Sequence, residues 1–258
     1  MKNIFEAFKI VKDKQIDALR MPSLPKEFIL KSISDSNINP RIVTHFYPKS
    51  PIAEQYYRLR ESIKSKMQKE SFKTIAITSA VNGEGKSITS LNLAVAMTKD
   101  VDCKKVLLID CDLRRGRIDH SLGLNSNVGL SEYLMLGTEI NNILFKTKIN
   151  KLTIIPRGKI ADNPSELLSS EKMKKLLGEL KKQFDVIIVD MPPLIPIADA
   201  SIVCAQSDMV LMAVRAGKTQ RGVVDHAAEF LAQAEANLIG YVLTHVEYYI
   251  PAYIYQYV

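Results

Sequence analysis

The stretch from Thr74 to Met97 constrains this chain more than any other, because it joins a strand, a glycine-containing loop and a helix. Thr74–Ser79 is a short β-rich run, and Ala80-Val81-Asn82-Gly83-Glu84-Gly85-Lys86-Ser87 follows it directly. Helical spacing of apolar residues then begins at Ile88. This order of elements around Gly-Lys-Ser is the context that identifies a phosphate-binding P-loop.

The residue types in this loop are those that phosphate binding requires. Gly83 and Gly85 allow the backbone N–H groups to point inward at phosphate oxygens, and the following helix adds its N-terminal partial charge. Lys86 can reach the β- and γ-phosphates, and the Ser87 hydroxyl can ligate Mg²⁺. The first glycine of the usual motif is replaced by Ala80, so this is a variant loop. We therefore expect ATP and Mg²⁺ as cofactors, bound by Val81, Asn82, Gly83, Glu84, Gly85, Lys86, Ser87 and Ile88.

Two acidic motifs follow two further β-rich runs. Val106–Ile109 leads into Asp110 and Asp112, and Val186–Val189 leads into Asp190. Ligands of an open α/β sheet bind beyond the carboxyl ends of the strands, so the three aspartates can converge on the P-loop. Mg²⁺ needs one or two carboxylates, which leaves a third free to accept a proton from an attacking hydroxyl. For either motif alone, a helix cap or a turn is the simpler interpretation.

Short β-rich runs alternate with helical stretches from residue 73 onward. This alternation predicts an α/β fold of the P-loop NTPase type, a mostly parallel sheet with helices on both faces. The expected strands are 74–79, 105–109, 152–155, 185–190, 208–214 and 238–243. The expected helices are 51–67, which opens with a serine cap and a proline, and 86–99, 171–183, 199–206 and 220–235.

Composition narrows the classes of function. Three cysteines without CxxC spacing and four scattered histidines argue against a disulfide framework and against a Cys/His metal centre. The net charge of +7 is uneven, because residues 1–70 hold 14 Lys and Arg against 8 Asp and Glu. A nucleic-acid binder more often carries its basic excess on the folded domain, so we expect no nucleic-acid partner.

We divide the chain into a basic leader and linker over 1–40, a P-loop domain over 41–247 and a tail over 248–258. Apolar residues in 4–19 lie near helical spacing, which fits either an amphipathic surface helix or packing on the chain's own core. Residues 21–50 contain four prolines and a Ser/Asn cluster, a composition typical of an irregular linker.

The tail is rich in tyrosine. Five of the ten tyrosines fall in the last eleven residues, namely Tyr248, Tyr249, Tyr253, Tyr255 and Tyr257. A terminal strand that pairs with the sheet and a segment that docks on a partner are two structural interpretations. A phenol is also a phosphoryl acceptor, and each phosphate adds a charge of about −1.5 to −2. Beside an ATP site, the tail therefore suggests that the enzyme phosphorylates itself or its neighbour.

Together these features resemble the bacterial tyrosine kinases (BY-kinases) of capsule and exopolysaccharide synthesis, in their stand-alone form. The similarity covers about residues 41–258. It is carried by the variant P-loop Ala80–Ser87, the motif Ile109–Arg114, the motif Val186–Pro193 and the tyrosine tail. Two departures are Asn82, where the family often has proline, and Met191, where it usually has serine or threonine.

The resemblance implies roles for individual residues. Lys86, Asp110, Asp112 and Asp190 would be the catalytic residues, with Asp110 as the base for the incoming tyrosine. Ser87, Asp112 and Asp190 would form the metal shell, and the five tail tyrosines would be the acceptors. The family's oligomerisation helix aligns with 51–67, where Glu54 and Arg60 match the motif, Tyr57 replaces its middle arginine, and the adjacent Arg58 is the substitute.

The resemblance also implies partners: a ring-like homo-oligomer in which one tail enters a neighbour's site, a membrane chain-length-determinant protein as activator, and a phosphatase. Such a chain would be cytoplasmic, held near the inner face of the plasma membrane through its activator. A positioning ATPase of the ParA/MinD type is the alternative, although its extra P-loop lysine has no counterpart in Ala80–Asn82. A non-catalytic scaffold that binds nucleotide is a third hypothesis.

Overall fold

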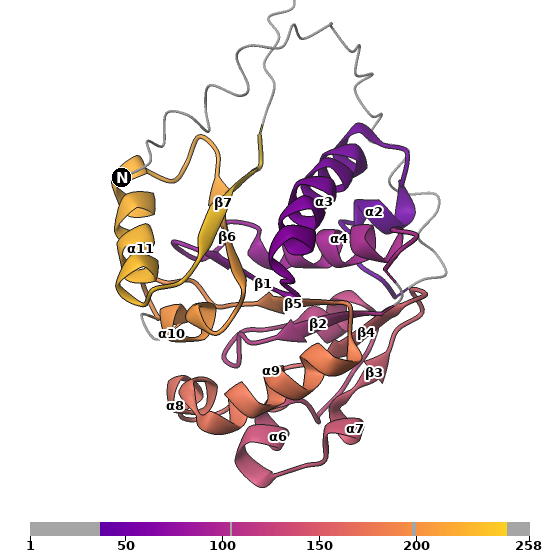
Figure 1. The fold of residues 1–258 in the computed structure, drawn as a ribbon, viewed down its shortest axis with the longest axis vertical. Coiled ribbons are helices and arrows are strands. Elements are labelled where there is room, and N and C mark those ends of the chain that lie inside the picture. The colour runs from indigo at the N-terminus through magenta and orange to yellow at the C-terminus, as the bar shows by residue number, and fades with distance from the viewer. Residues whose placement is uncertain (1–36, 104, 198–199, 247–258) are drawn as a thin grey trace, which may run out of the picture. The chain divides into compact units, whose positions relative to one another are not determined.

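The structure is a computed structural model that describes residues 37–103, 105–197 and 200–246. Its centre is a seven-stranded sheet in the order β3-β4-β2-β5-β1-β6-β7 (Figure 1). The expectations for the leader up to residue 36 and for the tail from residue 247 lie outside the described residues.

The sheet is parallel except at one edge, where β3 runs antiparallel to β4. The strands are β1 Thr74–Ser79, β2 Val106–Asp110, β3 Phe145–Lys146, β4 Leu152–Ile155, β5 Val186–Asp190, β6 Met209–Arg215 and β7 Leu238–Thr244. The six strands expected from the sequence are confirmed to within one residue at each end. The strand β3, which has only two residues, was not predicted.

The five helices expected from the sequence are confirmed as well. They are α3 Pro51–Glu70, α4 Lys86–Thr98, α9 Glu171–Gln183, α10 Ala200–Ala205 and α11 Arg221–Gln233. The Ser50 hydroxyl accepts from the N–H of Ala53, as expected for the cap of α3. Five short helices were not predicted: α2 Val43–Phe46, α5 Ile118–Ser121, α6 Leu130–Leu136, α7 Ile140–Ile143 and α8 Pro164–Ser169.

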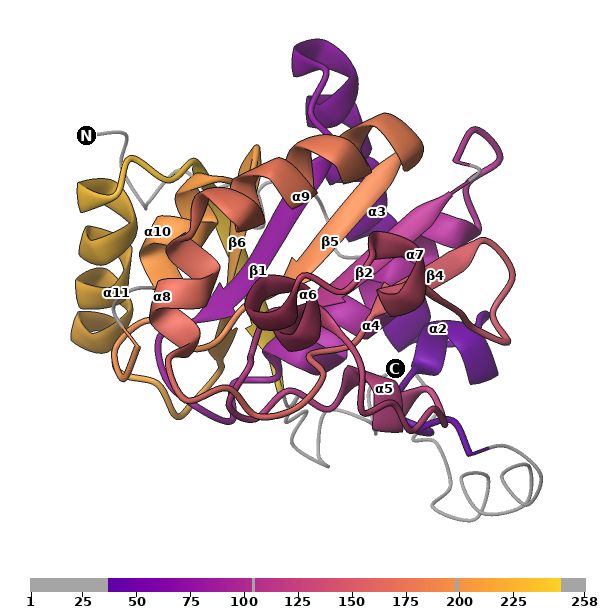
Figure 2. The same cartoon turned by 90° about the horizontal axis from the view of Figure 1, so that it is seen from below.

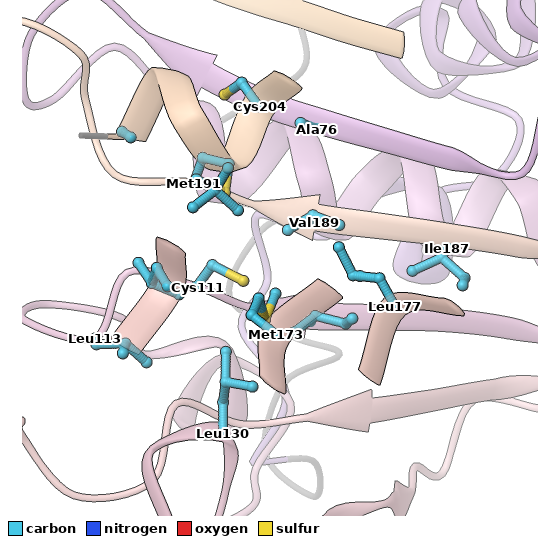
Figure 3. Close-up of a cluster of buried hydrophobic side chains, with 14 of the residues drawn as sticks. Ala76, Cys111, Leu113, Leu130, Met173, Leu177, Ile187, Val189, Met191 and Cys204 are labelled. Carbon is cyan, nitrogen blue, oxygen red and sulfur yellow. The ribbon is translucent and has the colours of Figure 1, made fainter. Parts of the chain in front are cut away.

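Helices cover both faces of the sheet (Figures 1 and 2). Alternate strand residues serve opposite faces, because the side-chain period of a strand is two residues. On β2, Leu107 and Ile109 pack into the layer below α9, and Val106 and Leu108 pack into the layer below α4. Figure 3 shows the first layer, in which β5 meets α9 through Ile187, Val189 and Leu177 among others. Burial on both faces explains the unbroken apolar runs of the central strands.

The stretch from residue 37 to 50 is not the irregular linker that its prolines predict. It carries α2, and Ile38 and Ile42 are buried in the α4 layer. Thr44 is fully buried, and its N–H and hydroxyl donate to the Asn92 side-chain oxygen of α4 over 3.1 Å. These contacts dock the segment on α4, so its buried isoleucines outweigh the local proline signal.

Within the described residues, the structure has no helix that is both long enough and apolar enough to span a bilayer. Cys103, Cys111 and Cys204 are free and buried, so they pack in the core as small apolar side chains.

Candidate active site

The site lies where the central parallel strands end. Asp110 closes β2 and Asp190 closes β5, and their Cα atoms are register partners on neighbouring strands. The next strand along the sheet is β1, which pairs with β5 and leads into the P-loop. The sheet topology thus brings together three motifs that are up to 110 residues apart in sequence, as the strand-end argument predicts.

The P-loop backbone takes the conformation that its glycines permit. Gly83 and Gly85 have φ of 81° and 84°, a region in which side-chain-bearing residues are strained. Gly85 caps α4, and Lys86 is the first residue of that 13-residue helix. A Cβ at Gly85 would lie 3.3 Å from Thr244, whose hydroxyl donates to the Glu84 carbonyl over 2.7 Å. The end of β7 therefore packs against the backbone of the P-loop and supports it.

Glu84 braces the loop with its side chain, which is buried. Its Oε2 accepts from the N–H of Val81 over 2.9 Å, and its Oε1 accepts from the Thr219 hydroxyl over 2.5 Å. The carboxylate is thus held inside the protein, and only the backbone of Glu84 remains for phosphate binding. Thr219 was not expected at the site, because nothing in the primary sequence places the β6–α11 loop beside residue 84.

The polar side chains of the P-loop contact the acidic motifs directly. Lys86 Nζ forms an ion pair with Asp112 Oδ2 over 3.1 Å. The hydroxyls of Ser87 and Ser90 donate to the two oxygens of Asp190 over 2.6 and 2.9 Å. Ser90 was not predicted as a site residue, although its position one turn after Lys86 on the same helix could have indicated it.

Asp110 is fully buried and is held by backbone N–H groups. Its Oδ1 accepts from Asp112 over 3.2 Å, and its Oδ2 accepts from Ile118 over 3.1 Å. The loop between them approaches so closely that a Cβ at Gly116 would lie 2.1 Å from Asp110 Oδ1. Only glycine fits there, a requirement that a single sequence does not reveal.

The electrostatics of this cluster favour a bound cation. Burial raises the pKa of Asp110 well above its usual range, and the negative charge of Asp190 raises it further. Burial also raises the pKa of Asp190, although Lys86 and the two serine hydroxyls oppose the change. Burial by itself would lower the pKa of Lys86, but the surrounding carboxylates outweigh that effect and raise it. Positive charge introduced beside the carboxylates relieves their mutual repulsion.

The donor set fits Mg²⁺ in the company of a nucleotide. A serine hydroxyl and carboxylates are the hard oxygen ligands that this ion prefers, and Ser87 and Asp190 already lie 2.6 Å apart. Among the described residues, no three His, Cys, Asp or Glu side chains form a ready metal cage. The protein alone therefore offers few ligands, and phosphate oxygens and water would complete the shell, as is usual for Mg²⁺.

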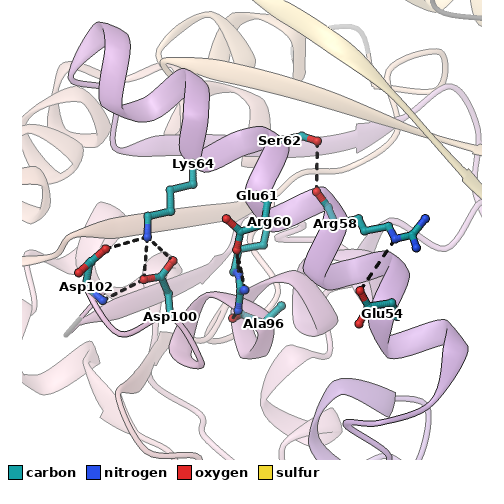
Figure 4. A network of polar contacts seen from close by, with 9 residues as sticks. All are labelled: Glu54, Arg58, Arg60, Glu61, Ser62, Lys64, Ala96, Asp100 and Asp102. Carbon is teal, nitrogen blue, oxygen red and sulfur yellow. Dashed lines mark hydrogen bonds and ion pairs between the residues drawn. The ribbon is translucent and has the colours of Figure 1, made fainter. Parts of the chain in front are cut away.

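The predicted oligomerisation residues lie on α3, outside this cluster (Figure 4). Glu54 and Arg58 are more than half exposed and lie 3.9 Å apart. Arg60 is mostly covered, because its guanidinium donates to the carbonyl of Ala96, pairs with Glu61 and lies 5.3 Å over the Tyr57 ring. Arg60 is thus engaged within its own chain, whereas Arg58 is open to solvent.

The fold and the site define a P-loop nucleotide-binding protein. The AAA domain family matches residues 72–235 of the chain. The septum site-determining protein MinD of Pyrococcus horikoshii superposes with a TM-score of 0.56 at 21% identity, covering 71% of this chain and 76% of that one. This second likeness concerns the fold alone.

Nearer relatives specify the family. Tyrosine-protein kinase YwqD of Bacillus subtilis is 34% identical over 83% of this chain and 90% of its own. Tyrosine-protein kinase CpsD of Streptococcus agalactiae is 32% identical over 70% and 79%. The kinase domain of Escherichia coli tyrosine kinase ETK superposes with a TM-score of 0.75 at 27% identity, covering 94% and 89%. The chain belongs to the bacterial tyrosine-protein kinases, which confirms the resemblance drawn from its motifs.

Proposed function

We propose that this kinase transfers the γ-phosphoryl group of ATP to tyrosines in the tail of a neighbouring copy, namely Tyr248, Tyr249, Tyr253, Tyr255 and Tyr257. The observation that carries the proposal is the buried, backbone-held carboxylate of Asp110, whose register partner at the end of the neighbouring strand is Asp190. Family membership supplies the reaction class, and half of the chain's tyrosines lie in the tail.

Each side chain has a part in the transfer. The P-loop N–H groups and Lys86 would hold the β- and γ-phosphates, and Ser87, Asp112 and Asp190 would hold Mg²⁺ directly or through water. Mg²⁺, when bound, neutralises charge across the β- and γ-phosphates. Asp110 accepts the phenol proton as the bond from tyrosine Oη to the γ-phosphorus forms. The bond from that phosphorus to its bridging oxygen breaks, and ADP leaves with the electron pair.

The proposal extends to partners and to cellular role through the family resemblance. One solved relative is the chimerical protein CapA2B2, which superposes with a TM-score of 0.76 at 29% identity over 82% of this chain and 93% of that one. We place this kinase beside a membrane chain-length-determinant activator, at the inner face of the plasma membrane. A ring-like homo-oligomer assembles through α3, and a phosphatase reverses the modification. The cycle regulates capsule or exopolysaccharide synthesis and export.

A mixing experiment tests transfer between copies. One chain carries Lys86→Met with an intact tail, and the other keeps its site but has phenylalanine at all five tail positions. After incubation with ATP and Mg²⁺, with and without the cytoplasmic segment of an activator, peptide mass mapping should find phosphate on the Lys86→Met tail only in the mixture.

Each chain incubated alone is the control. An unlabelled tail in the mixture, while the phenylalanine chain hydrolyses ATP at its usual rate, would refute the kinase proposal. That result would instead favour a positioning ATPase of the ParA/MinD type. Phosphate on the Lys86→Met chain by itself would contradict the role of Lys86.

A further inference from the structure

Residues 37–46 contact two elements that carry different parts of the active site. We refer to this segment, which contains α2, as the N-terminal strap. The strap packs on α4, the helix that begins with Lys86, and it is hydrogen-bonded to α5, which follows the loop after Asp110. Figure 2 shows α5 beside the segment that leads into α2. The strap therefore joins the helix of the P-loop to the element that precedes it nowhere in sequence and borders the acidic cluster in space.

The attachment to α4 is made by a buried amide. The side chain of Asn92 is fully buried, and its oxygen accepts from the N–H and from the hydroxyl of Thr44, each over 3.1 Å. Its nitrogen donates to the carbonyls of Arg41 and Ile88, each over 2.9 Å. Thr44 and Arg41 belong to the strap. A buried and satisfied amide fixes one arrangement of the elements that it joins, because a shift leaves donors and acceptors without partners.

The attachment to α5 is made by the backbone. The N–H of Asn39 donates to the carbonyl of Ser121, the last residue of α5, over 2.8 Å. Beyond that residue the chain approaches the strap so closely that a Cβ at Gly123 would lie 2.8 Å from the Cβ of Asn37. The C-terminal end of α5 is therefore held against the strap backbone.

The other end of α5 holds the proposed base. Ile118, the first residue of α5, donates its N–H to Asp110 Oδ2 over 3.1 Å. The side chain of Ile118 is buried in the same apolar layer as Ile38 and Ile42 of the strap. Because α5 has four residues, a single turn separates the strap contact at Ser121 from the bond to the carboxylate. A displacement of the strap would thus be transmitted to Asp110 through one helical turn.

We propose that the N-terminal strap is a positioning element for phosphoryl transfer, which sets the Asp110 carboxylate in register with the phosphate groups that Lys86 holds on α4. This inference rests on the proposed function, in which Asp110 accepts the phenol proton. A displacement of about 1 Å in a reacting group can lower a rate by a factor of about 10². A strap that is out of register should therefore lower kcat and leave ATP affinity nearly unchanged.

A pair of glycine variants tests the strap contact in the full-length chain. Gly123→Ala has a φ of 69° and places its methyl group 3.0 Å from the carbonyl oxygen of Asn37. Gly137→Ala is the matched control, because its φ is 74° and its Cβ would meet only Lys172 Nζ, at 3.7 Å. Both variants carry similar backbone strain, so the difference between them reports on the strap.

The two variants are compared in transfer to a peptide of residues 245–258 and in binding of a fluorescent ATP analogue. Relative to Gly137→Ala, Gly123→Ala should lower kcat by about tenfold or more, with the Kd for the analogue within about threefold. Equal kcat in the two variants would overturn the inference. A parallel fall in kcat and in ATP affinity would also overturn it, because the strap would then support the whole nucleotide site.

A conservative pair at Thr44 separates positioning from stability. Thr44→Val keeps the volume of the side chain but removes the hydroxyl that donates to Asn92, whereas Thr44→Ser keeps the hydroxyl and removes a buried methyl group. Both variants should be less stable than the wild type. Thr44→Val should lower kcat about threefold, the factor for one modest hydrogen bond, and Thr44→Ser should restore it. Equal losses of kcat in both would make the strap a structural brace only.

Hydrogen exchange at the Ile118 amide tests the attachment without any catalysis. This N–H is bonded to Asp110, so a loosened α5 should exchange it faster. In Gly123→Ala the exchange of Ile118 should be about tenfold faster than in Gly137→Ala, while the amide of Leu108 within β2 should exchange equally in both. Equal exchange at Ile118, or faster exchange at both amides, would contradict the proposed attachment.

The exchange measurement also distinguishes this inference from the proposed function. If the wild type transfers no phosphate but Ile118 responds to Gly123→Ala, the proposed function is wrong and the strap still holds the carboxylate in place. If the wild type transfers phosphate and neither kcat nor the exchange of Ile118 separates Gly123→Ala from its control, the inference is wrong and the proposed function stands.

Discussion

Acid groups at the two ends of the parallel sheet lie in opposite electrostatic surroundings. At the carboxyl end, burial and a like charge raise the pKa of Asp110. At the amino end, Asp208 precedes β6 and accepts from the N–H groups of Lys73 and Thr74, each over 2.8 Å, and from Lys181 Nζ over 2.7 Å. Although burial by itself would raise the pKa of Asp208, these donors outweigh it and lower the pKa.

The difference separates function from stability. Asp208 is an acid whose charge is satisfied within the chain, so its ionised form contributes to the stability of the fold. Asp110 and Asp190 are acids whose charges repel within the chain, so their ionised forms cost stability until a cation compensates them. Substitutions at the carboxyl end should therefore lower kinase activity, whereas a substitution of Asp208 at the amino end should lower stability.

The largest effect should come from Asp110→Asn. This change removes the proton acceptor but keeps the size of the side chain, so tail phosphorylation should fall by a factor of about 10² to 10⁴. Nucleotide affinity should stay within about threefold and the folded state should lose little stability, because a repulsive charge is lost together with one acceptor. Quantitative labelling and titration with a fluorescent ATP analogue measure the two quantities. Equal loss of both would make Asp110 a metal ligand and not the base.

Gly116→Ala should lower activity at the carboxyl end of the sheet through a steric clash alone, without removing a charge. The added Cβ would lie 2.1 Å from Asp110 Oδ1, so the loop or the carboxylate must move, at a cost of about 1–3 kcal/mol. Transfer should fall at least tenfold. Gly178→Ala is the matched control, because a Cβ in the middle of α9 meets nothing within 4 Å. The control should raise stability by about 0.5–1 kcal/mol and leave activity unchanged. Loss of activity in both variants would show that contact with the Asp110 carboxylate is not the reason for the effect.

Asp208→Asn should show the reverse pattern, with transfer unchanged and stability lower by about 1–3 kcal/mol. Because folding lowers the pKa of Asp208, its contribution is present above the unfolded pKa of about 4 and is lost as pH falls through the folded value. The variant should therefore lose less stability than the wild type between pH 5 and pH 3. Chemical denaturation at several pH values measures this difference. Parallel pH profiles would contradict the role assigned to Asp208.

The smallest effect on stability should come from Arg58→Ala on α3. Its pair with Glu54 is long and more than half exposed, so the free energy of unfolding should change by less than about 0.5 kcal/mol. If α3 assembles the proposed ring, sedimentation should nevertheless detect smaller oligomers. An unchanged oligomer would remove Arg58 from the proposed interface.

Local patterns predicted the elements that build the site, and long-range packing decided the rest. The unbroken apolar runs before Asp110 and Asp190 mark buried parallel strands, and their acidic ends follow from topology. By contrast, β3 consists of two residues, too few for any periodic signal. The proline-rich stretch before α3 gave a linker prediction that was wrong in part, since the burial of Ile42 depends on α4.

Contacts between residues within the site could not be predicted from the sequence either. Glu84 was placed among the nucleotide-binding residues because it lies in the P-loop, and nothing in the sequence indicates that its carboxylate turns inward to Thr219, 135 residues away. Gly116 gives no sign in the sequence that the Asp110 carboxylate will lie against it. A sequence motif identifies which residue types are present. The direction in which each side chain points depends on neighbours that only the fold brings near.

The most direct test of the account is the intact mass of the full-length chain after incubation with ATP and Mg²⁺, for wild type beside Lys86→Met. The account predicts a ladder of added phosphates in the wild type only, mapping to the segment from Tyr248 to Tyr257. Wild-type chains that hydrolyse ATP but gain no mass, also when an activator segment is present, would contradict it.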